Sequence, residues 1–204
     1  SLPNNLTEEF RAAEAAFYRK YLAALDGIER DRLPAEDQLS CDILRWECEI
    51  QLERLRFPAH LMPINQFYSL HLDIGQWAGG TSAQPFKTVR DYENWLKRLN
   101  AFTAWCYTAI DNMRVGKKRG YVLPKALTQK VIPQVVVMTK TPVEDHPYYV
   151  PIKQMPAGFS EVDRTRLAKA YARMIGEKVV PAFVDLEEFL TDEYLLASRS
   201  SSGI

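Results

Sequence analysis

Apolar side chains recur at steps of three and four residues along most of this sequence, which is the spacing that lines one face of an α-helix. The longest periodic stretch follows Thr88, and Asp91 three residues later resembles a capping box. Its apolar positions are Tyr92, Trp95, Leu99, Phe102, Cys106, Ile110 and Met113. Gly116 and Gly120 then bracket a basic turn, Lys117–Arg119. The pattern predicts one helix roughly 40 Å long, at about 1.5 Å per residue, which can cross a small domain.

Shorter stretches with the same period predict further helices on both sides of the long one. Asn5 is the predicted cap of the first helix, which is expected to end at Gly27. Ser160 is the predicted cap of a further helix, Gly176 and Pro181 mark a break or kink, and a last helix continues from Val184 to Tyr194. The predicted spans are 5–27, 35–57, 67–76, 124–140 and 160–194.

The predicted helix over residues 35–57 carries two separate apolar stripes. One consists of Leu39, Ile43, Trp46 and Ile50. The other consists of Cys41, Leu44, Cys48, Leu52 and Leu55. Because each stripe needs an apolar surface to cover it, we expect a central helix with neighbours on two sides.

Two segments rich in Pro, Gly and aromatic residues interrupt the helices. Residues 59–85 are expected to line a surface cleft, and residues 141–159 to run as an extended connector. Over 124–140 the run Val135–Val137 leaves a strand open as an alternative, although Pro133 and the apolar spacing favour a helix.

The predicted fold class is therefore mostly α: a multi-helical, bundle-like lobe with long irregular loops and little or no β. We expect residues 1–197 to form a single helical domain and residues 198–204 a linker-like tail. Because no initiator Met precedes Ser1, we also expect either that a leader was removed or that the chain is part of a longer protein.

Charge and motifs exclude several classes of function. The chain has 26 basic and 26 acidic residues, which gives no electrostatic argument for binding nucleic acid or an anionic membrane. No run of about 18 apolar residues predicts a membrane span. The HExxH, GxxxxGK[ST], GxGxxG and GxSxG motifs are absent. The histidines, His60, His71 and His146, lie on different segments, so no metal site is predicted.

Two features allow both a structural and a functional interpretation. The basic turn Lys117–Arg119, with Arg114 one helical turn earlier, can complement the negative end of the helix dipole or bind an anion such as a substrate carboxylate. His71 can be a hydrogen-bonded structural residue or a residue of a cleft.

Several segments resemble, in the same order, stretches of a bacterial family known as domain of unknown function 885. They are Leu33–Leu39, Phe67–Asp73, Thr88–Leu96, Asp111–Pro124, and Pro181–Leu190 with Glu193 and Tyr194. The family is similar to zincin-type metallopeptidases, and its zinc motif lies in a C-terminal half that follows the region matched here. The resemblance thus implies a zinc enzyme for the full-length protein, and no catalytic, cofactor-binding or metal residue for this chain.

The resemblance further implies an N-terminal lobe that forms one wall of a cleft for a peptide substrate, with the C-terminal catalytic half as its partner. It suggests a protein that is exported, periplasmic or lipid-anchored in a Gram-negative bacterium. The candidate cleft residues are His71, Arg114, Lys118 and Tyr121. The alternative is a self-sufficient helical binding module that uses residues 79–86 and the proline-rich connector. If a lobe lacks its other half, an exposed apolar face should cause self-association.

Overall fold

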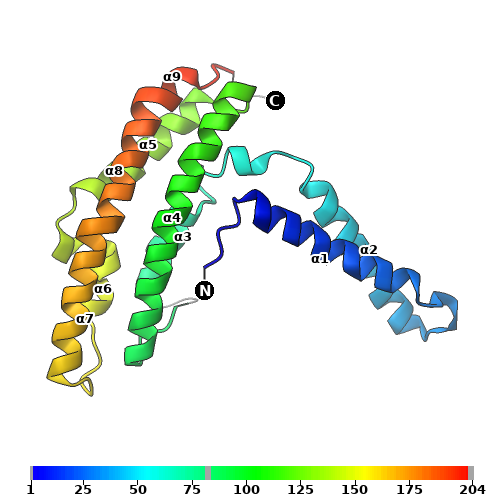
Figure 1. Cartoon of the computed structure of the whole chain (residues 1–204), viewed down its shortest axis with the longest axis horizontal. Coiled ribbons are helices and arrows are strands. Elements are labelled where there is room, and N and C mark those ends of the chain that lie inside the picture. The colour runs from blue at the N-terminus through cyan, green and yellow to red at the C-terminus, as the bar shows by residue number, and fades with distance from the viewer. Residues whose placement is uncertain (1, 81–83, 202–204) are drawn as a thin grey trace. The chain divides into compact units, whose positions relative to one another are not determined.

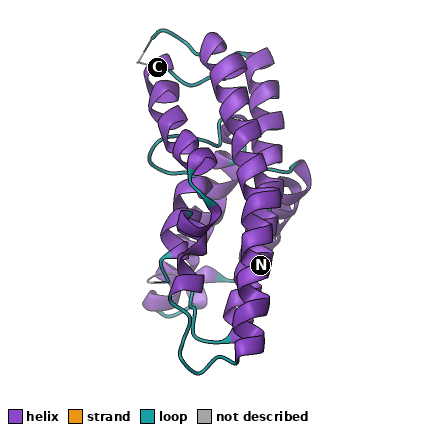
Figure 2. Cartoon of the chain, turned by 90° about the vertical axis from the view of Figure 1, so that its left-hand side faces the viewer, coloured by secondary structure: helices purple, strands orange, loops and turns teal. Residues whose placement is uncertain are grey.

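The computed structural model describes residues 2–80 and 84–201 and is built from helices joined by loops (Figures 1 and 2). Within these residues there is no β-strand, only one isolated bridge between Pro124 and Arg199. The predicted mostly α fold is therefore confirmed. No helix in the described part of the chain is long and apolar enough to cross a membrane.

The packing separates two compact units. The hairpin unit comprises residues 5–59, and the body unit comprises residues 1–4 and 60–204, of which residues 2–4, 60–80 and 84–201 are described. This division concerns contacts between backbone segments, so the expectation that residues 1–197 form a single domain stays a prediction about cooperative folding.

The hairpin unit consists of α1 (Glu8–Asp26) and α2 (Ala35–Arg54), joined through a 3₁₀ turn, η1 (Arg30–Arg32). Thr7, and not the predicted Asn5, is the N-cap of α1, because its hydroxyl accepts a hydrogen bond from the Phe10 amide at 3.2 Å. Ion pairs between Arg45 and Asp26 (2.9 Å) and between Arg54 and Glu14 (3.0 Å) join the two helices.

The two apolar stripes of α2 differ in burial. In the stripe that contains Cys48, this residue is buried, Cys41, Leu52 and Leu55 are half-buried, and Leu44 is 41% exposed. The exposed fractions of the other stripe are 59% for Leu39, 57% for Ile43, 62% for Trp46 and 38% for Ile50. In the hairpin unit α2 therefore lacks the second neighbour that its sequence predicts.

The body unit is organised around α4 (Val89–Arg119), which is 31 residues long. The capping box of Thr88 and Asp91 is present, and Gly120 ends the helix in the left-handed conformation at φ 81°. The predicted apolar positions Tyr92, Trp95, Leu99, Phe102, Cys106, Ile110 and Met113 are all buried. The predicted helix, its N-terminal capping box and its buried face are therefore confirmed. Its C-terminal end differs from the prediction, because Gly116 and Lys117–Arg119 form the last turn of α4 and not a separate basic turn after it.

A segmented C-terminal helix lies along α4 (Figure 1). It consists of α7 (Glu161–Met174), α8 (Val180–Glu188) and α9 (Leu195–Ala197), linked by two π-helical turns, η5 (Ile175–Val179) and η6 (Phe189–Tyr194). The break or kink predicted at Gly176 and Pro181 is thus a π-helical turn in a continuous helix. Pro181 has no amide hydrogen to donate, and the π-helical turn before it accommodates the missing hydrogen bond.

The other body elements cover the remaining faces of the core. They are η2 (Ala59–Leu61), α3 (Leu70–Ala78), α5 (Lys125–Lys140), η3 (Val143–Asp145), η4 (Pro147–Tyr149) and α6 (Val150–Lys153). Residues 125–140 are helical despite Pro133, with Val131 and Val135 buried, so the strand alternative is wrong. The connector predicted to be extended instead contains three short helical turns, in which Pro142, Pro147 and Pro151 occupy N-cap or first-turn positions.

Ser198 and Arg199 are held against the body unit, although composition predicts a linker from Ser198 onward. The Arg199 amide donates to the Leu123 carbonyl at 3.2 Å, and its carbonyl accepts from the Lys125 amide at 2.8 Å. The Ser198 hydroxyl lies 2.8 Å from that of Thr128. These bonds satisfy polar groups beside a buried Thr128, which composition does not reveal.

Candidate functional site

The C-terminal end of α4 carries most of the side chains that the sequence singles out. Arg114 and Lys117 both donate to the Glu193 carboxylate, each at 2.8 Å, and the Arg114 guanidinium also lies 5.3 Å from the centre of the Phe189 ring. Hydrogen bonds from Arg114 and Lys117 lower the pKa of Glu193 to about 2. The Arg114 guanidinium is therefore already bound by Glu193 and Phe189 of the C-terminal helix.

Lys118 and Tyr121 differ from Arg114 in their surroundings. Lys118 is exposed, and 43% of Tyr121 is exposed. Tyr121 begins the segment after α4, where its amide donates to the Gly116 carbonyl at 2.9 Å and fixes the backbone. These two side chains can reach a ligand without breaking an existing ion pair.

A hollow of about 340 Å³ beside Arg114 is lined mainly by acids. Its lining residues are Ile110, Arg114, Asp185, Glu188, Phe189, Asp192 and Glu193. An anionic ligand would meet several carboxylates there, so the geometry favours the helix-end interpretation of the basic residues over an anion site at Arg114.

His71 and His146 are buried in the body unit. His71 is 4% exposed, and its Nδ1 lies 2.8 Å from the Ser69 hydroxyl. The Nδ1 of His146 accepts a hydrogen bond from the Tyr148 amide at 3.2 Å. Burial lowers the pKa of both histidines to about 4, against smaller opposing effects of the Gln134 side chain on His71 and the Met138 backbone on His146. Both are neutral imidazoles at pH 7 in the interior.

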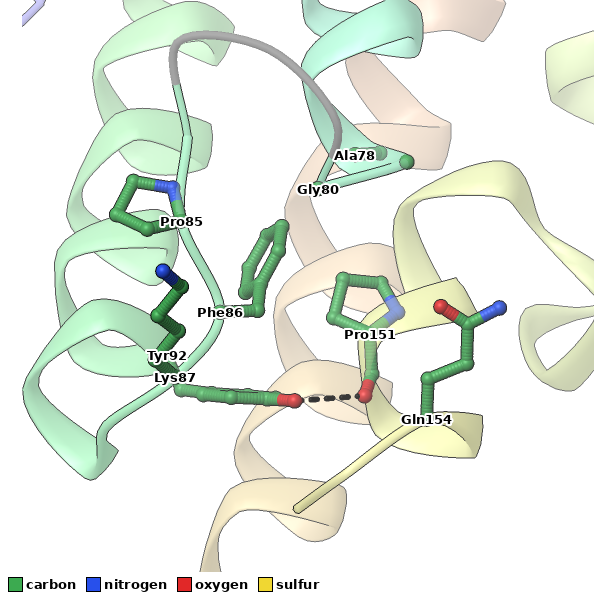
Figure 3. A pocket seen from close by; sticks show the side chains of 9 residues that line it. Ala78, Gly80, Pro85, Phe86, Lys87, Tyr92, Pro151 and Gln154 are labelled. Carbon is green, nitrogen blue, oxygen red and sulfur yellow. Dashed lines mark hydrogen bonds between the residues drawn. The ribbon is translucent and has the colours of Figure 1, made fainter.

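A second pocket, of about 360 Å³, lies between the loop that precedes α4 and the proline-rich connector (Figure 3). Its walls are Ala78, Gly79, Gly80, Pro85, Phe86, Lys87, Tyr92, Pro151 and Gln154. The Tyr92 hydroxyl donates to the Pro151 carbonyl at 3.0 Å, which ties the connector to α4. Lys87 is the only charged side chain among these residues.

The described residues do not fit a zinc ion. Within 2–80 and 84–201, no group of three or more His, Cys, Asp or Glu side chains is placed to hold a metal. The Nδ1 atoms of His71 and His146 already have hydrogen-bond partners, and their rings lie in the protein interior. A zinc ion implied by the family resemblance therefore finds no ligand set among these side chains.

Sequence reasoning missed Glu193 as the partner of Arg114. The two residues are 79 positions apart, and Glu193 lies in the π-helical turn η6. The one available signal was that both residues lie in segments that resemble the family.

The chain belongs to the family described as "Bacterial protein of unknown function (DUF885)", which matches residues 1–203. It is similar in structure to a crystal structure described as that of "the putative lipoprotein from Colwellia psychrerythraea", with a TM-score of 0.79 and 17% sequence identity. The match covers 97% of this chain and 34% of that one, so this chain spans about a third of the solved protein's length. At this identity the likeness concerns the fold alone. A search of curated proteins found no match.

Proposed function

We propose that this chain is the N-terminal helical lobe of a zincin-like peptidase and forms one wall of its substrate cleft. The observation that carries the proposal is the extent of the structural match, in which nearly the whole chain aligns with about a third of a larger protein. The ordered family segments support the peptidase class. The catalytic groups and the zinc ion are proposed to lie in the C-terminal half of the same polypeptide.

Within this lobe we propose Lys118 and Tyr121 as the residues that contact a peptide substrate. Both are exposed beside the end of α4, and neither has to leave a buried position. Arg114 is proposed to be a positioning residue: its ion pair with Glu193 holds the end of α4 against the C-terminal helix and so fixes this side of the cleft. His71 is buried, so a substrate contact at His71 would require α3 to move.

The proposed location is outside the cytoplasm of a Gram-negative bacterium, either periplasmic or attached to a membrane by a lipid. The description of the structural neighbour as a lipoprotein supports this proposal.

The test uses the polypeptide encoded by the complete reading frame that contains this chain. We expect about one zinc ion per polypeptide by mass spectrometry, and hydrolysis of fluorogenic peptides that is lost on chelation and restored by zinc. The 204-residue chain alone should hydrolyse nothing. A complete polypeptide without zinc and without chelator-sensitive hydrolysis contradicts the proposal.

The pocket between residues 79–87 and the connector favours a second candidate, a self-sufficient binding module. Its mixed lining of Pro85, Phe86 and Gln154 with the Lys87 ammonium suits a small polar ligand that carries an anionic group. In this case the 204-residue chain should bind the same ligands as the complete polypeptide, and Lys87→Ala should weaken that binding. The matched control is Lys97→Ala, an exposed lysine on α4 that does not line the pocket.

A further inference from the structure

The exposed stripe of α2 is an apolar surface without a partner in its own unit. Leu39, Ile43, Trp46 and Ile50 follow one another at steps of four, three and four, which is the spacing of a coiled-coil seam. At about 100° per residue, the centre of this stripe lies roughly 170° around the helix from the centre of the second stripe, which contains the buried Cys48. Covering it therefore takes a different element from α1.

The flanks of this stripe are acidic. Glu36 and Glu47 follow it along one side of α2, and Asp42, Glu49 and Glu53 along the other. Asp42 is bound by Arg30 in the turn before α2, and Glu47 accepts from Gln51 at 2.7 Å. Glu36, Glu49 and Glu53 are exposed.

The basic residues of α2 do not neutralise the acidic residues on the flanks of the stripe, because they pair with acidic residues of α1. Arg45 points to α1, where it pairs with Asp26, and Arg54 pairs with Glu14 of α1. Arg54 lies on the same flank as Glu36 and Glu47, but the Glu14 carboxylate pairs with it.

A second copy of the chain in a parallel arrangement would bring the same acidic flanks together, and like charges across a helix pair disfavour that arrangement. In an antiparallel arrangement Glu49 and Glu53 would still face acidic residues, and Arg54 would have to leave Glu14 to meet Glu36 of the other copy.

We propose that the α2 stripe binds an amphipathic helix whose apolar face is flanked by lysine or arginine residues. The apolar seam supplies the affinity, and the acidic flanks choose the partner and its register. This surface is separate from the candidate cleft residues of the body unit.

The test measures binding of two labelled synthetic helices to the full 204-residue chain by fluorescence anisotropy. Both probes have leucine and isoleucine at the seam positions; one has lysine at every flanking position, and the other has glutamate. We expect the lysine probe to bind at least about tenfold more tightly, with an advantage that falls as salt is raised. Equal binding of the two probes, or no binding of either, would overturn the proposal.

Variants separate the seam from the flanks. The double substitution Ile43→Glu with Trp46→Glu should reduce binding of the lysine probe at least about tenfold, while Phe17→Ser on α1, also exposed, should change it less than about twofold. Circular dichroism checks that each variant keeps its helix content. The triple change of Glu36, Glu47 and Glu53 to Lys should reverse the preference toward the glutamate probe, and an unchanged preference contradicts the role of the flanks.

Two further measurements on the free chain exclude other occupants. Acrylamide should quench Trp46 strongly, as judged by the difference between the chain and its Trp46→Phe variant, because the side chain is exposed. A shielded Trp46 would show that the chain itself covers the stripe. Any self-association of the chain, which the sequence predicts for a lobe without its other half, should persist in sedimentation of the Ile43→Glu, Trp46→Glu variant. A dimer that this variant abolishes would make a second copy the occupant. Either result overturns the proposal.

Discussion

A Cβ atom on Gly116 would lie 2.7 Å from the Leu61 carbonyl oxygen and 2.9 Å from the Tyr121 carbonyl oxygen. Neither backbone group can move without displacing a packed segment, so Gly116→Ala should lower the free energy of unfolding by about 2 kcal/mol or more. Gly158→Ala is the matched control, since its added Cβ meets nothing within 4 Å. Urea denaturation of both variants makes the comparison, and equal losses would contradict the close approach at Gly116.

The two buried histidines should make stability depend on pH. In the folded state the pKa of His71 and of His146 is about 4, whereas an unfolded histidine has a pKa of about 6.5. The unfolded chain therefore takes up these protons first as the pH falls. Stability that is fully present above pH 6.5 should decline toward pH 4, on the order of 2–3 kcal/mol per histidine.

Unfolding free energies measured between pH 7 and pH 4.5 check this dependence. His146→Asn keeps an acceptor near the Tyr148 amide but does not titrate in this range, so it should remove about half of the decline. A free energy of unfolding that stays constant over this range would contradict the buried neutral state of the histidines.

At the scale of elements, the cap of α4 is the feature whose contribution the structure isolates best. The Thr88 hydroxyl accepts from the Asp91 amide at 3.3 Å, and the Asp91 carboxylate accepts from the Thr88 amide at 2.8 Å. Thr88→Ala should lower the unfolding free energy by about 1 kcal/mol. Thr165→Ala, at an exposed position inside α7, should be neutral or slightly stabilising, since alanine favours helix. Equal effects of the two changes would argue against the capping box.

The sequence predicts those parts of the fold that depend on local order. The apolar period and the N-terminal capping box of α4 are local, and both predictions are confirmed. The predicted basic turn Lys117–Arg119 is instead the last turn of α4, which ends at Gly120. The π-helical turns η5 and η6 depend on how α7 and α8 register against α4, which no local pattern encodes. The Glu193 partner of Arg114 was missed for the same reason.

The candidate cleft residues were predicted partly from resemblance and partly from charge, and their surroundings depend on long-range packing. Sequence alone cannot distinguish an exposed Lys118 from a Lys117 bound to Glu193, one residue earlier on the same helix. Burial of His71 likewise depends on tertiary contacts. The nearby Ser69 hydroxyl gives its Nδ1 a hydrogen-bond partner, but this local contact does not bury the ring.

At the scale of the whole molecule, the two units differ in how much apolar surface they bury. In the hairpin unit the buried apolar residues are Leu6, Leu25 and Cys48, whereas α4 alone buries a full stripe in the body unit. Backbone amides of α1 and α2 should therefore exchange hydrogen faster than those of α4, because the hairpin opens at a lower free energy. Hydrogen-exchange mass spectrometry tests this, and equal protection would support a single cooperative domain over residues 1–197.

The central claim is that this lobe supplies a substrate-binding wall but no catalytic group. The most direct measurement is peptide hydrolysis by the complete polypeptide that carries Lys118→Ala or Tyr121→Ala, with Lys169→Ala on α7 as the exposed control. We predict a KM that rises by about threefold to tenfold, with kcat and zinc content unchanged, because only binding shared by ground state and transition state is lost. Unchanged KM in both variants, or a kcat that falls with KM constant, would contradict the claim.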